Sequence, residues 1–138
     1  MVDADILRRK TAQVLHHAAR LEHRAELDAA TLASDEDLAN AVLMDIQQAI
    51  QGCIDLAAHA CADDDLGAPA NAAEAFALIA RAGLIDTALA TRLTAAAGLR
   101  NLIVHQYASL DYARVLDAAR AGLADLRALV AALAADAH

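Results

Sequence analysis

Helix-breaking residues are almost absent from this sequence. Its 138 residues contain one proline, Pro69, and five glycines. Hydrophobic residues make up 59% of the chain and aromatic residues only 2%, and the apolar content is mainly alanine and leucine, both strong helix formers. A sheet protein would need more valine, isoleucine, threonine and aromatic residues. We therefore expect an all-α fold, with helix packed on helix in a single domain spanning residues 1–138.

The spacing of apolar residues predicts an antiparallel bundle of four to five helices with short links. In the longest pattern, apolar side chains recur at steps of mostly three and four residues from Leu38 to Cys61. The first predicted helix covers about residues 5–27, and the second runs from a cap at Ser34 or Asp35 to about residue 63. Two further helices cover residues 71–83 and 86–107. The last begins at a cap at Ser109.

The net charge of −8 is concentrated in one part of the sequence. Residues 31–70 hold eight acidic residues and no lysine or arginine, whereas acids and bases balance on either side. Non-specific binding of nucleic acid depends on neutralising phosphates with basic residues, so an acidic chain disfavours it. Because the excess is localised, we expect it to disfavour one surface rather than every surface.

The sequence predicts a soluble, cytoplasmic protein without membrane association. No stretch approaches the ~20 uncharged apolar residues that span a bilayer, and the acidic start lacks the plan of a signal peptide. Cys53 and Cys61 lie eight residues apart on one predicted helix. That spacing is about 12 Å, too far for a disulfide, so we expect reduced thiols.

Polar residues interrupt the apolar pattern in the segment from Arg100 to Tyr107. Arg100 and Tyr107 are seven residues apart, which places them on the same side of a continuous helix. Asn101 and His105 are four apart and share a neighbouring face. Residues 102–104 are leucine, isoleucine and valine, and we expect them to hold the segment against the core.

These groups suit the cleavage of RNA without a metal ion. The imidazole of a histidine titrates near neutral pH, so His105 can take a proton from a ribose 2′-hydroxyl or give one to the leaving oxygen. Arg100 offers a two-pronged donor to a phosphate, and Asn101 could orient His105 or the phosphate. The spacing alone does not decide the matter, because an arginine and a histidine near a helix end are often surface or capping groups. Tyr107 could equally be a packed aromatic with one buried hydrogen bond.

The segment resembles the Arg-x4-6-His motif of HEPN domains, in the Arg-x4-His-x-Tyr form of the HepT-like toxins. The resemblance extends over roughly residues 5–135. Its matching stretches are 40–59, 71–76, 82–85, 98–107 and 110–111.

This resemblance implies a metal-independent endoribonuclease toxin without a cofactor, in which Arg100 and His105 match the catalytic pair. It implies a homodimer in which two motif segments meet in a shared cleft at the subunit interface. It also implies a partner antitoxin, a small MntA-like nucleotidyltransferase that silences the toxin by adding AMP to the motif tyrosine, here Tyr107. The alternative is a non-catalytic helical adaptor that binds a nucleotidyltransferase or a nucleotide. The intact Arg100/His105 pair favours the enzyme, whereas the acidity and the single lysine, Lys10, favour the adaptor.

Other polar clusters give weaker indications. Arg20, His23 and Arg24 share a face of the first predicted helix, and they form either a supplementary RNA-contacting strip or a solvated surface. The histidines of this helix lack carboxylate or thiolate partners at a spacing that would predict a metal site. Residues 63–65 are three aspartates without the other positions of a calcium loop. No glycine-rich phosphate loop is present, so we do not expect the chain itself to be the nucleotidyltransferase.

Overall fold

The computed structural model describes residues 3–24 and 26–136, and these residues form helices and no strand. In chain order the elements are α1 (Ala4–His23), α2 (Ala29–Ser34), α3 (Glu36–Asp63), α4 (Ala72–Arg81), α5 (Thr87–His105), the 3₁₀ turn η1 (Tyr107–Ser109) and α6 (Tyr112–Asp136). The predicted all-α fold is confirmed. In the described residues, no helix is both long enough and apolar enough to cross a membrane.

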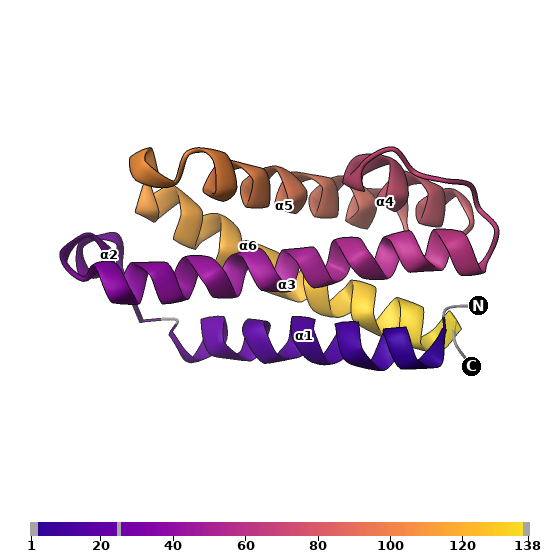
Figure 1. Ribbon diagram of the computed structural model, residues 1–138, viewed down its shortest axis with the longest axis horizontal. Helices are drawn as coiled ribbons and strands as arrows, with labels where there is room; N and C mark the ends of the chain where they lie inside the picture. The colour runs from indigo at the N-terminus through magenta and orange to yellow at the C-terminus, as the bar shows by residue number, and fades with distance from the viewer. Residues whose placement is uncertain (1–2, 25, 137–138) are drawn as a thin grey trace.

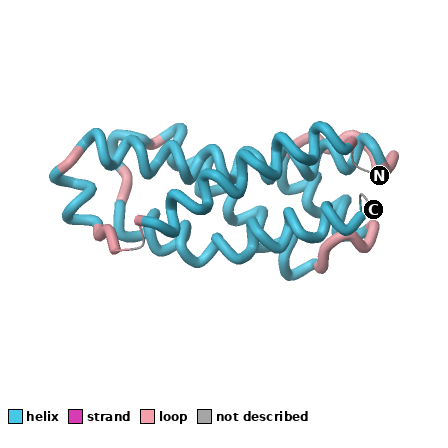
Figure 2. The backbone as a smooth tube through the Cα atoms, turned by 90° about the horizontal axis from the view of Figure 1, so that it is seen from below, coloured by secondary structure: helices cyan, strands magenta, loops and turns pink. Residues whose placement is uncertain are grey.

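Four long helices build the bundle, and α3 lies at its centre. In Figure 1, α1 and α5 flank α3 on opposite sides, and α6 crosses behind it. Figure 2 shows the same elongated bundle from below, with loops confined mainly to its two ends. The end of α1, the short α2 and the end of α5 all lie at the bundle end opposite the chain termini (Figure 1).

Helix ends follow the side chains that can cap them. The carboxylate of Asp35 accepts from the backbone N–H of Leu38 at 3.1 Å, and Asn71 and Asp86 cap α4 and α5 in the same way. These caps are confirmed, but the cap predicted at Ser109 is wrong. Ser109 lies in η1, and the carboxylate of Asp111 accepts from the N–H of Arg114 at 3.3 Å where α6 begins.

The first predicted helix was too long, and α2 was not predicted. α1 ends at His23 instead of continuing to residue 27, although residue 25 within that range lies outside the described residues. Asp28 then starts α2 by accepting hydrogen bonds from the backbone and side chain of Thr31, at 2.8 and 2.7 Å. These hydrogen bonds lower the pKa of Asp28 because they favour its charged form. Asp28, a capping residue close to the end of α1, was the sequence signal that a second, short helix begins there.

The core follows the apolar stripe of α3 closely. Val42, Ile46, Ile50 and both cysteines are buried as predicted, and both cysteines are free thiols. Burial raises the pKa of the Cys53 thiol to about 12. Gly52 lies at a close approach of α3 to α1, since a β-carbon there would lie 2.6 Å from Cγ2 of the buried Val14.

Candidate active site

The candidate site lies on the part of α5 that α4 does not cover. α4 has 10 residues and α5 has 19, so they are about 15 and 28 Å long. A short turn joins them, and α4 therefore runs back along only the first half of α5 (Figure 1). Ala73, near the start of α4, lines the same groove as Thr94 of α5. The second half of α5, from about Gly98 to His105, carries the motif.

Arg100 is half-buried and has an unsatisfied donor. Its Nε atom is shielded from solvent but has no hydrogen-bond partner among the residues that the structure describes. A buried donor without a partner costs about 1–3 kcal/mol, which is an unusual cost to retain in a folded chain. A phosphate oxygen would satisfy this donor if its binding moved the side chain and exposed Nε.

Asn101 and His105 are both exposed, four residues apart on the last turns of α5. Gly98 lies seven residues before His105 and therefore on the same side of the helix. A β-carbon at Gly98 would meet no atom of a neighbouring element within 4 Å. The face that presents the amide and the imidazole is therefore open, and a large ligand can approach it.

Residues 102–104 do not all pack against the core, contrary to the prediction. Ile103 is fully buried, but Leu102 and Val104 are 40% and 48% exposed. Three consecutive residues spread over about 200° of a helix, so one core contact cannot cover them all where α4 is missing. The end of α5 therefore presents apolar side chains as well as polar ones.

Tyr107 does not share a helix side with Arg100, because α5 ends at His105. Gln106 leaves the helical conformation with φ −125° and ψ 32°, and Tyr107 begins η1. The tyrosine is 46% exposed, and no hydrogen bond joins its hydroxyl to the described part of the chain. It is therefore not the packed aromatic with a buried hydrogen bond that was the alternative interpretation.

The guanidinium groups of Arg20 and Arg24 both form ion pairs with Asp45 of α3. This carboxylate is only 3% exposed, and it accepts from Nε of Arg20 at 2.9 Å and from Nη1 of Arg24 at 3.1 Å. Nδ1 of His17 lies 2.8 Å from the same carboxylate. The role of Asp45 was not predicted from the sequence. The signal was its position four residues before Ala49, which places it on a face of α3 that is buried.

The structure separates these α1 residues from the motif. Arg20 and His23 belong to α1 and Arg24 follows it directly, and α3 lies between α1 and α5 (Figure 1). Arg100, Asn101 and His105 lie instead on the second half of α5, and Tyr107 lies just beyond it in η1. Within residues 3–24 and 26–136, no three His, Cys, Asp or Glu side chains are arranged to hold a metal ion.

A family model described as "Ribonuclease HepT-like" matches residues 14–133, which include all four motif residues and the Asp45 cluster. The chain belongs to the HepT-like ribonuclease family. This HepT-like chain is 28% identical over 132 residues to a protein of Shewanella oneidensis named mRNA nuclease HepT. The match covers 96% of this chain and 98% of that protein.

Solved structures resemble the HepT-like chain over nearly its whole length. One contains a tri-AMPylated Shewanella oneidensis HEPN toxin in complex with MNT antitoxin. The toxin is 28% identical to this chain, with a TM-score of 0.85 and coverage of 96% of this chain and 99% of that one. A second, a toxin–antitoxin structure with AMP-PNP, is 27% identical with a TM-score of 0.84, covering 95% and 99% of the two chains. The HepT-like assignment therefore rests on sequence and on fold.

Proposed function

We propose that this HepT-like protein is a metal-independent endoribonuclease toxin in which Arg100 and His105 carry out cleavage. The observation that supports it best is the half-buried guanidinium of Arg100, whose Nε has no partner, on the same open helix end as the exposed His105. The two residues are five positions apart, which is about 7.5 Å along the helix axis. They also leave the helix about 140° apart around its axis, so an RNA linkage that contacts both must reach across the end of α5.

The chemistry needs only the substrate and these side chains. The imidazole of His105 accepts the proton of a ribose 2′-hydroxyl, and the oxygen attacks the adjacent phosphorus. The bond from phosphorus to the 5′-oxygen breaks, and the imidazolium returns the proton to that oxygen. Arg100 stabilises the charge that develops on the phosphoryl oxygens, and Asn101 orients the imidazole or the phosphate. The products are a 2′,3′-cyclic phosphate and a free 5′-hydroxyl.

The protein acts as a homodimer in this proposal. One arginine and one histidine are few donors for a cleft that must hold an RNA backbone, and a two-fold pair doubles both. The apolar side chains exposed beside the motif, Leu102 and Val104, are the kind of surface that a subunit interface covers.

Removing either proposed catalytic side chain should abolish RNA cleavage. His105→Ala should lower the rate by about 10²–10⁴-fold, and Arg100→Ala by about 10²–10³-fold, the ranges typical of a lost acid–base group or oxyanion donor. Cleavage of a synthetic RNA is followed by gel, with circular dichroism as the test of folding. His16→Ala and Arg81→Ala, which change exposed residues on other helices, serve as controls and should retain activity.

The same assay tests the mechanism. Cleavage should persist in EDTA, the products should carry a 2′,3′-cyclic phosphate, and DNA should stay intact because it lacks the nucleophile. Loss of activity in EDTA, or cutting of DNA, would contradict the proposed chemistry even if both variants were inactive.

We further propose that a small MntA-like nucleotidyltransferase is the partner antitoxin and adds AMP to Tyr107. Support comes from the exposure of Tyr107 and from the tri-AMPylated state of the similar Shewanella toxin. The phenolic oxygen attacks the α-phosphorus of a nucleoside triphosphate, pyrophosphate leaves, and the partner's active site removes the phenolic proton. The added phosphate lies near the site where RNA phosphates must bind, so the adduct blocks the cleft without unfolding the protein.

Coexpression with the partner should raise the intact mass of the chain by whole AMP increments, and peptide mapping should place them at Tyr107. Tyr107→Phe should abolish the increments. The chain has one other tyrosine, Tyr112, which is half-buried, and Tyr112→Phe should leave the modification unchanged. Silencing without any change in mass would show that the antitoxin inhibits by binding alone.

The second candidate function is a non-catalytic adaptor for the nucleotidyltransferase or a nucleotide. The engagement of Arg20 and Arg24 by Asp45 favours it, because the shared carboxylate offsets one of the two positive charges that RNA binding would use. An adaptor would bind the nucleotidyltransferase with equal affinity whether or not His105 is present, and the wild-type chain would leave RNA uncut.

A further inference from the structure

The buried carboxylate of Asp45 is shared by two guanidinium groups. Nε of Arg20 donates to Oδ1 and Oδ2 at 2.9 and 3.2 Å, and Nη1 of Arg24 donates to Oδ2 at 3.1 Å. Nδ1 of His17 lies 2.8 Å from Oδ1. Two positive charges therefore meet one negative charge, and the cluster keeps a net positive charge at the end of α1.

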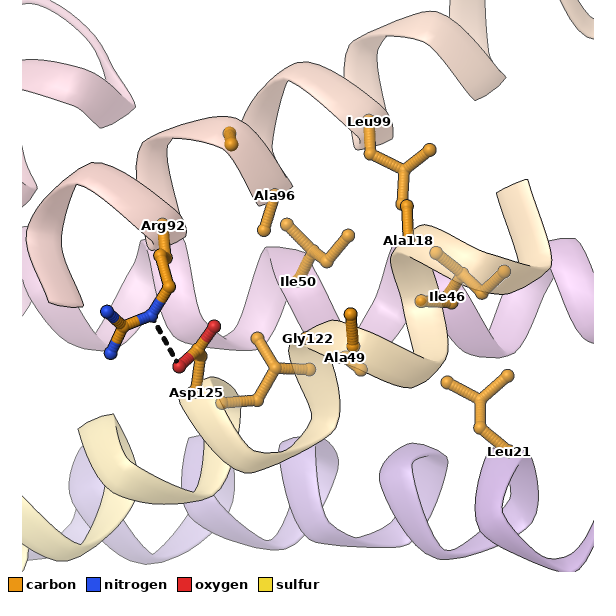
Figure 3. A pocket seen from close by; sticks show the side chains of 14 residues that line it. Leu21, Ile46, Ala49, Ile50, Arg92, Ala96, Leu99, Ala118, Gly122 and Asp125 are labelled. Atoms are coloured by element: carbon orange, nitrogen blue, oxygen red, sulfur yellow. Dashed lines mark hydrogen bonds and ion pairs between the residues drawn. The ribbon is translucent and has the colours of Figure 1, made fainter. Parts of the chain in front are cut away.

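The other ion pairs in the described part of the chain each join one base to one acid. Figure 3 shows such a pair, Arg92 with Asp125, at one end of an apolar cavity of about 250 Å³. A matched pair has no net charge and therefore little to offer a phosphate, whose binding depends on neutralisation by bases. Among the ion pairs of the described residues, the Asp45 cluster alone holds bases in excess.

The two guanidinium groups keep donors free for a ligand. Arg20 uses only Nε to bind Asp45, and 44% of its side chain is exposed. Arg24 uses only Nη1 and is 26% exposed. A guanidinium has five N–H donors, so most of them remain available on each residue. Asp45 also holds both side chains in place, and a ligand therefore need not order them when it binds.

The composition of the cluster fits a phosphate. Sequence spacing grouped Arg20 and Arg24 with His23, but His23 is exposed and forms no hydrogen bond with the described residues. His17 joins the two arginines instead. Paired guanidinium groups present planar forks of donors that match phosphate oxygens, and a neighbouring imidazole can add another donor.

The cluster lies at the same end of the bundle as the motif, but on the other side of α3 (Figure 1). Packed helices lie about 8–10 Å apart, so the axes of α1 and α5 are about 16–20 Å apart across α3. A single RNA linkage cannot reach both places. An RNA several nucleotides long can pass over the end of the bundle and contact both.

We propose that Arg20 and Arg24 bind a backbone phosphate of the RNA, remote from the linkage that is cut. The proposal rests on the proposed ribonuclease function and adds a second contact to it. Asp45 acts as a positioning residue, because it orients both guanidinium groups toward solvent. In the proposed homodimer the two motif segments meet on the α5 side of the bundle, so the α1 side stays open to RNA.

Binding of a fluorescent single-stranded RNA of about 20 nucleotides tests this site. A methyl group on every 2′-hydroxyl removes the nucleophile, so the active chain binds this RNA without cutting it. Arg20→Ala and Arg24→Ala should each raise the dissociation constant by about 10-fold, as expected for a lost charge-assisted hydrogen bond. Each should also lower the slope of log affinity against log salt by about 0.7, the share of one phosphate on a single strand. Fluorescence anisotropy at several salt concentrations gives both quantities.

Arg9→Ala is the matched control. Arg9 lies on the same helix, is exposed and forms no ion pair with the described residues, but it is near the bundle end that holds the chain termini. Its loss removes the same charge and should leave the dissociation constant and the slope unchanged. An equal effect of Arg9→Ala would show that net charge alone sets the affinity, and would overturn the site.

A conservative variant separates binding from folding. Arg20→Lys keeps a cation for Asp45 but removes the fork of donors, so it should melt like the wild type and still bind the RNA several-fold more weakly. If Arg20→Lys and Arg24→Ala are folded and bind RNA like the wild type, the phosphate site does not exist. The site would also be overturned if these variants bind RNA normally but lose affinity for the partner nucleotidyltransferase, which would then be the ligand of the cluster.

Cleavage of unmodified RNA by the same variants distinguishes this proposal from the proposed function. A wild-type chain that leaves RNA uncut while the expected affinity losses are observed would contradict the ribonuclease and support the phosphate site. A wild-type chain that cuts RNA while the Arg20 and Arg24 variants keep full affinity would contradict the phosphate site alone.

Discussion

Asp45 is a charged side chain in an otherwise apolar part of the core, and two side chains of α1 and one that directly follows it donate hydrogen bonds to its carboxylate. Its carboxylate receives three donors at 2.8–3.1 Å, from His17, Arg20 and Arg24. Burying a carboxylate is costly unless it is paired and hydrogen-bonded, and here the pairing joins α1 to α3. The cluster also keeps a positive charge at the surface, because two guanidinium groups share one carboxylate.

Asp45→Asn should destabilise the protein by about 2–3 kcal/mol, since it keeps the shape but removes the charge that the arginines bind. The matched control is Asp55→Asn on the same helix, where Asp55 pairs with Lys10, accepts a hydrogen bond from Gln51 and is 27% exposed. That pair is partly solvated and should contribute less than about 1 kcal/mol. Urea unfolding followed by circular dichroism measures both. Equal losses would show that burial adds nothing to the Asp45 cluster.

The roles of individual residues were only partly predictable. The types and spacing of Arg100, Asn101 and His105 indicated a reactive strip, and the structure places them on an open helix end. The break after His105 was not predictable, because neither glycine nor proline marks it and Gln106 makes the turn. The partner of Arg20 and Arg24 lies 25 and 21 residues away on another helix, and single-helix spacing does not predict such pairs.

The interior glycines of α3 and α5 lie in opposite surroundings. Gly52 of α3 faces α1, and an added β-carbon would lie 2.6 Å from Val14 and 3.5 Å from the carbonyl oxygen of Lys10. Gly98 of α5 faces open space. Intrinsic helix propensity favours alanine over glycine at both positions. A difference in stability between the two glycine-to-alanine variants therefore reports the effect of packing.

Gly52→Ala should destabilise the protein by about 1–3 kcal/mol, because valine cannot move aside within a buried contact and α1 must shift away. Gly98→Ala should instead stabilise the free protein by about 0.5–1 kcal/mol. Thermal unfolding of the two variants gives the comparison directly. A stabilised Gly52→Ala variant would mean that α1 and α3 tolerate a wider separation than the packing indicates.

Element boundaries were predictable where a capping side chain begins a helix, as at Asp35, Asn71 and Asp86. They were less predictable at the ends of helices, where α1 stops without a glycine. The exposure of Leu102 and Val104 depends on how far the neighbouring α4 extends, and apolar spacing within α5 carries no information about that.

At the scale of the whole molecule, the sequence predicted that the acidic excess of residues 31–70 would lie on one surface. In the structure this charge lies instead at the two ends of α3. Residues 35–37 lie at its start and residues 63–65 at its end, separated by most of a 28-residue helix of about 42 Å. The two acids between them, Asp45 and Asp55, are both paired with cations of α1. The middle of the bundle is therefore close to neutral, and one acidic end lies near the motif (Figure 1).

The shortness of α4 has a consequence for how members of this family diverge. The start of α4 lies level with about Thr94, six residues before Arg100, so about two more turns at that start, or 11 Å, would cover Gly98 and Asn101. A lineage could thus lose its nuclease by an insertion, with every motif residue unchanged, and keep the fold as a scaffold. In comparisons between genomes, the length of the segment corresponding to residues 72–81 is therefore a second criterion for an active enzyme, independent of the motif itself.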